Sequence, residues 1–275
     1  MPIAIADPDD PRIEPYRAVR ERDLAGRQHR FIAEGEVVLR VLLKQRRFEI
    51  ESLLLAENRM ESLGDALGNL PPDVPVYMAS RRVMDAVVGF PIHRGILAVA
   101  HRAPLPPVKD FLAALPPNGL VLGLVGLTNH DNVGGIFRNA AAFGAQGILL
   151  DSESCDPLYR KAVRVSVGGA LVVPFTRAAS ADAMVQALQA ASFDILALSP
   201  SGTEVLSQVR PTRRMALLLG AEGPGLPPDL LARTRTASIP MSSGFDSLNV
   251  ATTSGIALHH LTSRLREEPP PLAEL

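Results

Sequence analysis

The second half of this 275-residue sequence alternates between apolar strand-like runs and helical segments, and this alternation limits its fold most strongly. Residues 120–127 (LVLGLVGL) and 147–151 (GILLD) are continuous apolar runs, with a helix predicted over 134–144 between them. Such runs are typical of strands buried on both faces of a parallel sheet. Further strands are expected at 171–175, 195–199, 216–220 and 237–240, and helices at 181–191 and 248–264. The predicted fold class is α/β, with a parallel sheet and helices on both faces.

A proline-bracketed segment, residues 103–117 (APLPPVKDFLAALPP), precedes this region. Proline pairs disfavour the interiors of helices and sheets, so they suit a linker. The region before it is predicted to be a small α/β sandwich. Its expected helices are at 34–47 and 80–88, and its expected strands are at 50–56, 74–79 and 95–100. The predicted organisation is a flexible N-terminus (1–11), a first domain (12–103), a linker (104–117), a second domain (118–268) and a flexible tail (269–275).

The composition, 47% apolar and 21% charged, is that of a globular protein. One cysteine, Cys155, excludes an internal disulfide and a cysteine-based zinc site. The histidines lack ligand spacing, so no metal is expected. The N-terminus lacks a signal-peptide pattern, and no apolar run reaches the length of a membrane-spanning helix. We therefore expect a cytoplasmic protein without a membrane partner.

Charge is uneven along the chain although the formal net charge is only −1. The segment from Arg12 to Arg47 holds ten basic and five acidic residues. A basic segment on a neutral protein is typical of a module that binds a polyanion. A general preference for arginine, which outnumbers lysine 25 to 3 in the whole chain, explains the charge equally well.

The first of three unusual segments is residues 129–144 (NHDNVGGIFRNAAAFG), which follows a strand and enters a helix. Asn132 is expected to be the N-cap of this helix. A helix N-terminus together with Arg138 forms a natural phosphate site. The alternative is a capped helix with a surface arginine.

The second segment is residues 217–226 (LLLGAEGPGL), a buried strand that ends in Gly220 and is followed by Glu222. Its glycines allow backbone groups to approach a flat ligand closely. The pattern matches neither the dinucleotide-binding nor the P-loop fingerprint, which disfavours those two classes of site. The alternative is a plain strand–turn–helix with a solvated glutamate.

The third segment is residues 239–260 (IPMSSGFDSLNVATTSGIALHH), a short strand, a Ser/Gly loop and a long helix. Ser247 is expected to cap this helix, with Asn249 in its first turn. Alanine, threonine, serine and glycine in the helix permit close packing against another backbone. The alternative is a serine-capped core helix.

In this order, the three segments resemble the SpoU/TrmH family of RNA ribose methyltransferases, part of the SPOUT class. The family motifs are an Asn followed six residues later by Arg, a strand ending in Gly-Ala-Glu-Gly, and Ile-Pro-Met followed by Ser-Leu-Asn-Val. The first motif matches Asn132, Gly134 and Arg138, and the second matches residues 220–223. The third matches residues 239–241 and 247–250. The resemblance spans about residues 118–265, and residues 30–43 resemble a ribosomal-protein-like substrate-binding domain.

This chain departs from the family pattern at two places. Family members often carry Asp-Pro where it has Asn129-His130, and a serine where it has Ala251. The first departure could alter the loop that enters the first motif. The second removes a hydroxyl from the final helix.

The resemblance implies a C-terminal trefoil knot, an exception to the rule that proteins are unknotted. It also implies S-adenosyl-L-methionine (AdoMet) as methyl donor, a ribose 2′-hydroxyl as acceptor, and a homodimer. The substrate would be structured RNA, with ribosomal RNA favoured over tRNA because of the separate first domain.

Site residues follow from the same resemblance. The implied catalytic residues are Asn132, Arg138, Glu222, Ser247 and Asn249. The implied AdoMet-binding residues are Leu198, Ser199, Gly220, Glu222, Gly223, Ile239, Met241, Leu248 and Asn249. The implied RNA-binding residues are Arg20, Arg22, Arg27, Arg30 and Arg138. Because a guanidinium is not deprotonated in proteins, we expect Arg138 to orient the ribose and phosphate instead of acting as a base.

Three other interpretations remain open. The chain could be a non-catalytic RNA-binding protein that keeps the fold, a different α/β enzyme that binds nucleotides, or a SPOUT enzyme that methylates a base. The Asn and Arg of the first motif favour ribose over base, and the missing phosphate motifs disfavour a nucleotide enzyme.

Overall fold

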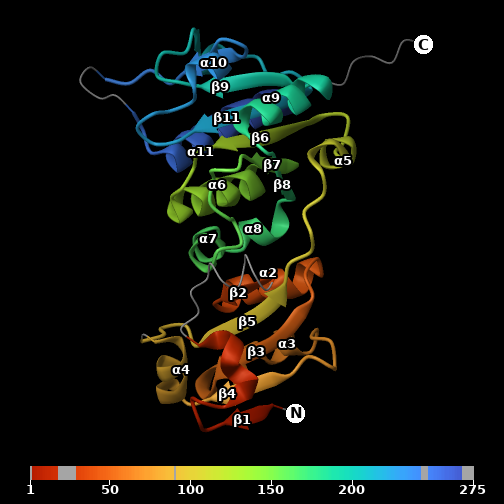
Figure 1. Ribbon diagram of the computed structural model, residues 1–275, viewed down its shortest axis with the longest axis vertical. Coiled ribbons are helices and arrows are strands. Elements are labelled where there is room, and N and C mark those ends of the chain that lie inside the picture. The colour runs from red at the N-terminus through yellow and green to blue at the C-terminus, as the bar shows by residue number, and fades with distance from the viewer. Residues whose placement is uncertain (1, 18–28, 90, 243–246, 268–275) are drawn as a thin grey trace. The chain divides into compact units, whose positions relative to one another are not determined.

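The computed structural model describes residues 2–17, 29–89, 91–242 and 247–267 (Figure 1). The chain divides into two compact units, one of Met1–Pro104 with Asp156–Val172 and one of Leu105–Cys155 with Val173–Leu275. The second domain expected at 118–268 includes residues 156–172, whereas the structure groups these residues with the first unit. The reason is tertiary packing, because helices α7 (Arg160–Val165) and α8 (Gly169–Val172) contact a strand and a helix of the first unit.

The first unit contains a mixed five-stranded sheet in the order β1-β4-β3-β5-β2. In that order the strands are Ile3–Ile5, Val76–Ala79, Ile50–Ala56, Ile96–His101 and Arg30–Glu34. β1, β4 and β3 are parallel, and β5 is antiparallel to both β3 and β2. The other elements are η1 (Pro11–Tyr16), α2 (Glu36–Gln45), η2 (Glu57–Arg59), η3 (Glu61–Leu63), α3 (Gly64–Leu67) and α4 (Arg81–Val88).

Tyr16, at the end of η1, fixes that short helix onto the sheet. Its ring is 1% exposed, and its hydroxyl lies 2.7 Å from Oγ of the buried Ser52 in β3. Burial raises the pKa of the Tyr16 phenol, since the low-dielectric surroundings disfavour the phenolate. The phenol is therefore a neutral core group joined to the sheet by a hydrogen bond.

The second unit contains a seven-stranded parallel sheet in the order β10-β12-β9-β11-β6-β7-β8. In that order the strands are Glu204–Val205, Arg235–Ser238, Asp194–Leu198, Arg214–Gly220, Gly119–Val125, Gly147–Leu150 and Phe175–Arg177. The helices are α5 (Val108–Ala113), α6 (His130–Phe143), α9 (Ala181–Ala190), η4 (Leu206–Gln208), α10 (Pro228–Leu231) and α11 (Val250–Glu267). The predicted parallel α/β architecture is confirmed.

One predicted strand, at residues 171–175, is wrong. Helix α8 occupies its first part, and β8 begins only at Phe175. Ser166 Oγ accepts the N–H of Ala170, which supports a helical turn. Pro174 has no N–H to give to a sheet, so a strand is favoured only after it.

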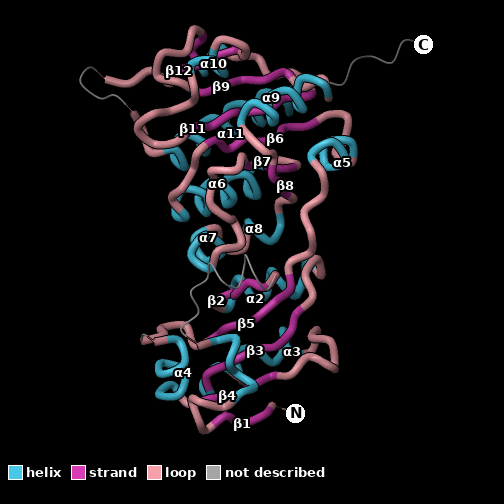
Figure 2. The backbone as a smooth tube through the Cα atoms, viewed as in Figure 1, coloured by secondary structure: helices cyan, strands magenta, loops and turns pink. Residues whose placement is uncertain are grey.

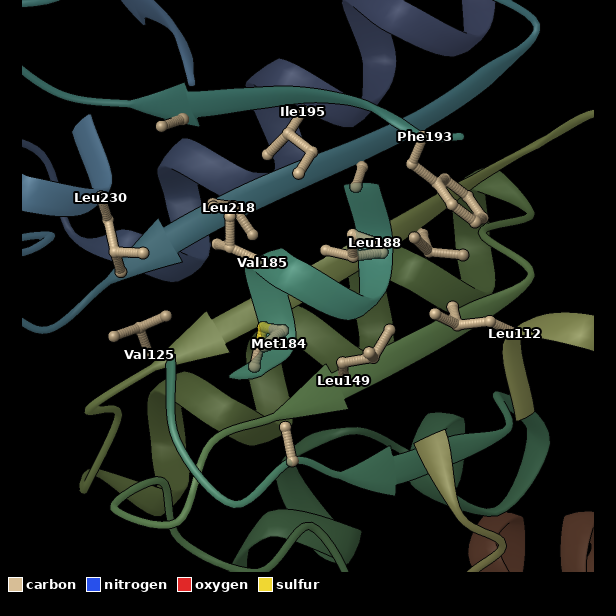
Figure 3. Packing of buried hydrophobic residues seen from close by; sticks show 14 of the residues in the cluster. Leu112, Val125, Leu149, Met184, Val185, Leu188, Phe193, Ile195, Leu218 and Leu230 are labelled. Atoms are coloured by element: carbon tan, nitrogen blue, oxygen red, sulfur yellow. The ribbon is translucent and has the colours of Figure 1, made fainter. Parts of the chain in front are cut away.

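Helices cover both faces of this sheet. On one face, α9 packs Met184 and Leu188 among the buried side chains of the strands, including Leu149 and Leu218 (Figure 3). On the other face, α6 and α11 pack against each other. Gly123 of β6 leaves room for the packing of α9, since an added Cβ would clash with Leu218 Cδ2 and lie 2.7 Å from Met184 Sδ. The sheet is therefore covered by helices on both faces.

The strand order positions the site. From β6 the chain adds β7 and β8 on one side, whereas β11 pairs with β6 on its other side. In parallel sheets, ligands bind beyond the carboxyl ends of the strands where the order reverses. The loops that follow β9, β11 and β12 gather at that end of the sheet (Figure 2).

Among the described residues, no helix is both long and apolar enough to cross a membrane. Within the same part of the chain, no group of three or more His, Cys, Asp or Glu side chains could hold a metal ion.

Candidate functional site

A cavity of about 980 Å³ lies at the carboxyl ends of β9, β11 and β12 and the start of α11. All nine residues that the sequence predicts to bind AdoMet line this cavity. They are Leu198, Ser199, Gly220, Glu222, Gly223, Ile239, Met241, Leu248 and Asn249. The loops after β9, β11 and β12 and the start of α11 therefore share one cavity at the carboxyl ends of parallel strands.

The loop after β11 folds back tightly onto the end of its own strand. The N–H of Gly225 donates to the carbonyl of Ala221 at 3.0 Å. A Cβ added at Gly220 would lie 2.5 Å from the backbone carbon of Gly225, and Gly223 has φ +86°. Glycine is required at both positions, at Gly220 for close approach and at Gly223 for the left-handed backbone.

A polar group joins the three segments. Nδ2 of Asn249 donates to Oδ1 of Asn132 at 2.8 Å and to Oε1 of Glu222 at 3.0 Å. Glu222 is exposed at the cavity, whereas Asn132 is 5% exposed. Asn132 Nδ2 is also buried and has no hydrogen-bond partner in the described part of the chain. An unsatisfied buried donor costs about 1–3 kcal/mol, so the fold keeps Asn132 here against a local penalty.

Both predicted helix caps are wrong. α6 begins at His130 and is capped by Asn129, whose Oδ1 accepts the N–H of Asp131 at 2.8 Å. The departure at Asn129-His130 therefore supplies the cap, and Asn132 lies in the first turn.

α11 begins at Val250, and Asn249 caps it by accepting the N–H groups of Ala251 (3.0 Å) and Thr252 (3.2 Å). A capping oxygen must reach the second or third amide of its helix, which Ser247 is too early to do. Ser247 instead lies exposed on the cavity lining.

Arg138 does not line the cavity. It is exposed on α6, and among the described residues no hydrogen bond or ion pair involves its guanidinium. It follows Asn132 by six positions on the helix, which turns it by about 120° around the helix axis. The structure thus brings together Asn132, Glu222 and Asn249, and presents Arg138 on a different face of the same helix.

Of the arginines predicted to bind RNA in the first unit, the structure describes Arg30. It begins β2, and its Nε pairs with Glu51 at 2.7 Å. The other three, Arg20, Arg22 and Arg27, lie outside the described residues.

Sequence reasoning missed Asp151, which holds the loop leading into α6. Its carboxylate accepts from the N–H of Gly126 (3.0 Å) and from both the N–H (2.8 Å) and the hydroxyl (2.7 Å) of Ser154. Asp151 is 4% exposed, so these three donors compensate the burial of its charge. A carboxylate directly after an apolar strand was the available signal.

Known proteins resemble this chain closely. The model of the SpoU rRNA Methylase family matches residues 119–259. An uncharacterized tRNA/rRNA methyltransferase of Mycobacterium tuberculosis is 40% identical over 268 residues, covering 94% of this chain and 91% of the relative. The 23S rRNA (guanosine-2′-O-)-methyltransferase RlmB of Acinetobacter baylyi is 29% identical over 69% of this chain and 78% of its own length.

Solved structures share the fold along nearly the whole chain. The AdoMet-bound rRNA methyltransferase from Sinorhizobium meliloti superposes with a TM-score of 0.80 at 22% identity, covering 97% of this chain and 99% of that one. An RNA 2′-O ribose methyltransferase gives a TM-score of 0.76 at 23% identity, covering 96% and 99%. The family match covers the first two unusual segments and all but the last residue of the third, and it includes every residue that lines the cavity. The chain therefore belongs to the SpoU rRNA methylase family and is an RNA methyltransferase.

Proposed function

We propose that this protein transfers a methyl group from AdoMet to a ribose 2′-hydroxyl of a structured RNA, with ribosomal RNA favoured over tRNA. The observation that carries the proposal is the cavity lined by Glu222 and Asn249, where Asn249 is hydrogen-bonded both to Glu222 and to the buried Asn132. The name of the RlmB relative, which acts on the 2′-oxygen of 23S rRNA, supports both the ribose and the ribosomal substrate. Such a substrate would be met in the cytoplasm.

The residues present fit AdoMet. The cavity has the size and the mainly apolar lining, with a few polar groups, of a site for a molecule of this class. Leu198, Ile239 and Met241 supply apolar surface for a flat base, and the loop after Gly220 supplies backbone groups. Among the described residues of the lining, Glu222 alone is charged, and its carboxylate attracts a sulfonium.

When bound, AdoMet supplies an activated methyl group on its sulfonium. The protein then has to hold the 2′-oxygen in line with that methyl, which is chiefly a matter of positioning. Asn249 holds Glu222 and Asn132 in one arrangement at the cavity edge. Arg138, exposed on α6, orients ribose and phosphate by its planar fork and stabilises developing negative charge on the 2′-oxygen.

The proposal includes a trefoil knot in the second unit and a homodimer. The cavity is made by the loops after three strands together with the start of α11, an arrangement that suits a chain threaded through its own loops. Leu248, two residues before α11, and Ile256 on α11 are 39% and 41% exposed, and a second copy packed against this part of the chain would cover them. The ribosomal-protein-like nature of the first unit and the role of Arg30 in RNA binding belong to the same proposal.

The test is transfer of isotope-labelled methyl from AdoMet to total ribosomal RNA and total tRNA, alongside calorimetric titration with AdoMet. The proposal expects saturable AdoMet binding and label in ribosomal RNA. AdoMet binding without label in any RNA would instead favour a non-catalytic RNA-binding protein.

A further inference from the structure

Helices α6 and α11 approach each other as closely as small residues allow. A Cβ added at Gly135 would lie 2.7 Å from the Cβ of Ala251, and one added at Gly255 would lie 3.2 Å from Nδ2 of Asn139. Both distances are shorter than the optimal carbon contact of about 3.5–4.0 Å. Ala251 therefore faces Gly135 across a contact that leaves little room for a larger side chain.

One polar side chain bridges this contact. Nδ2 of Asn139 on α6 donates to the backbone carbonyl of Ala251 at 2.7 Å and to Oγ of Ser254 at 2.9 Å. Ser254 is fully buried and donates its own hydroxyl to the same carbonyl at 2.7 Å. On the other side of the same residue, Asn249 accepts the N–H of Ala251. Both the N–H and the carbonyl of Ala251, in the first turn of α11, are therefore held by side-chain hydrogen bonds.

The position of Asn139 on α6 links this bridge to the proposed site. Asn139 follows Asn132 by seven residues, almost two full turns, so both side chains lie on the same face of α6. Asn132 contacts Asn249 before the first turn of α11, and Asn139 contacts that turn itself. Arg138 is the neighbour of Asn139, about 100° around the helix. Fixing Asn139 therefore fixes the rotation of α6 and the direction of Arg138.

We propose that Asn139 is a positioning residue for methyl transfer. Its amide locks the first turn of α11 onto α6, which keeps Asn249 against Asn132 and Glu222 and sets the direction of Arg138. The inference rests on the proposed function, because it assigns these groups to the reaction. Asn139 does not line the cavity, so we assign it a role that it exerts through its neighbours.

The test is Asn139→Asp, which keeps the side-chain size but replaces the donating amide with a carboxylate that faces the Ala251 carbonyl. Hydrogen exchange, followed by mass spectrometry, is compared for residues 250–256 and 257–265. We expect exchange at 250–256 to rise about tenfold or more, because a locally held turn is released. We expect kcat to fall about tenfold or more while KM for RNA changes by less than about threefold, because misplacement acts on the reacting geometry.

Leu261→Ala is the matched control, since Leu261 is fully buried further along the same helix. It should lower the unfolding temperature while kcat of the folded enzyme stays near normal. Unchanged exchange at 250–256 in Asn139→Asp would overturn the proposal. The proposal would also be overturned if Asn139→Asp lowered kcat no more than Leu261→Ala does when the two variants lose the same amount of unfolding temperature.

The exchange measurement needs no RNA substrate, so it separates the two proposals. If the wild-type protein methylates no RNA, the proposed function fails. Exchange at 250–256 then still shows whether Asn139 holds the first turn of α11, and an unchanged value overturns that role independently.

Discussion

Asn249 and Asn132, 117 positions apart in the chain, are joined by a hydrogen bond of 2.8 Å from Nδ2 to Oδ1. The same Asn249 side chain caps α11 through its oxygen and contacts Glu222 through its nitrogen. One residue therefore starts a helix and assembles the polar group at the cavity. Because its oxygen and nitrogen have separate tasks, the two can be tested separately.

Asn249→Asp and Asn249→Ala should both lose methyl transfer, but Asn249→Asp should be the more stable of the two. Aspartate keeps the capping oxygen, whereas alanine removes it at a cost of about 1 kcal/mol in the free energy of unfolding. Both variants lose the donor to Asn132 and Glu222, and aspartate adds a like charge beside Glu222. Urea unfolding and methyl transfer on the same preparations would check this. Full activity of Asn249→Asp would show that the Nδ2 contacts are dispensable.

Arg138→Ala should abolish methyl transfer and leave AdoMet binding near the wild-type value, since Arg138 does not line the cavity. Arg138→Lys keeps the charge but loses the planar fork, so we expect only partial activity. Calorimetry with AdoMet and single-turnover transfer to RNA provide the two readouts. Near-normal turnover by Arg138→Ala would rule out its role as substrate clamp.

Gly220→Ala should destabilise the protein by about 1–3 kcal/mol and weaken AdoMet binding, because overpacking displaces a backbone. The added Cβ would lie 2.5 Å from the backbone carbon of Gly225, which cannot move without distorting the cavity. Gly64→Ala is the control, since a Cβ there meets nothing within 4 Å. Chemical unfolding gives the free energy of unfolding of both variants. Equal values for Gly220→Ala and Gly64→Ala would contradict the close approach of Gly220 to Gly225.

Tyr16→Phe should change how stability depends on alkaline pH. Burial raises the pKa of the Tyr16 phenol above the ordinary 10.0, so the folded state favours the neutral form. Its contribution to the free energy of unfolding is complete below about pH 10 and is lost as the pH rises further. Tyr16→Phe should lower the free energy of unfolding by about 1 kcal/mol at neutral pH, because Ser52 loses its partner. Above about pH 10, the free energy of unfolding of the variant should decline less steeply than that of the wild type. Parallel pH profiles of the unfolding free energy would argue against this.

The sequence predicts the second unit well because its strands are long and apolar. The predicted strands at 120–127 and 216–220 overlap the two central strands, β6 and β11, and their continuous apolar character leaves little ambiguity. The strand predicted at 171–175 fails because apolar residues around Pro174 fit a helix turn and a strand equally. Short apolar runs carry no periodic signal that separates the two.

The caps show a second limit of sequence reasoning. Asn129 and Asn132 are both good capping residues, as are Ser247 and Asn249, and local preference does not choose between them. The choice depends on a tertiary contact, the bond between Asn132 and Asn249, which draws Asn132 into the first turn of α6.

Long-range packing also decides where residues 156–172 belong. An added Cβ at Gly168 would lie 3.0 Å from that of Val41, so this glycine packs directly on α2 of the first unit. No local sequence pattern predicts that contact. The motif residues, in contrast, follow from the resemblance to the SpoU/TrmH family, because this sequence carries the family's glycine and polar residues at the same spacing.

The central claim is that the transferred methyl ends on a ribose oxygen. The most direct measurement is mass spectrometry of nucleosides from ribosomal RNA incubated with this protein and AdoMet carrying a deuterated methyl group, with Arg138→Ala alongside. Our account predicts label in a 2′-O-methylnucleoside, on the ribose fragment, with the wild-type protein and none with the variant. Label on a base fragment, or equal label with the variant, would contradict it.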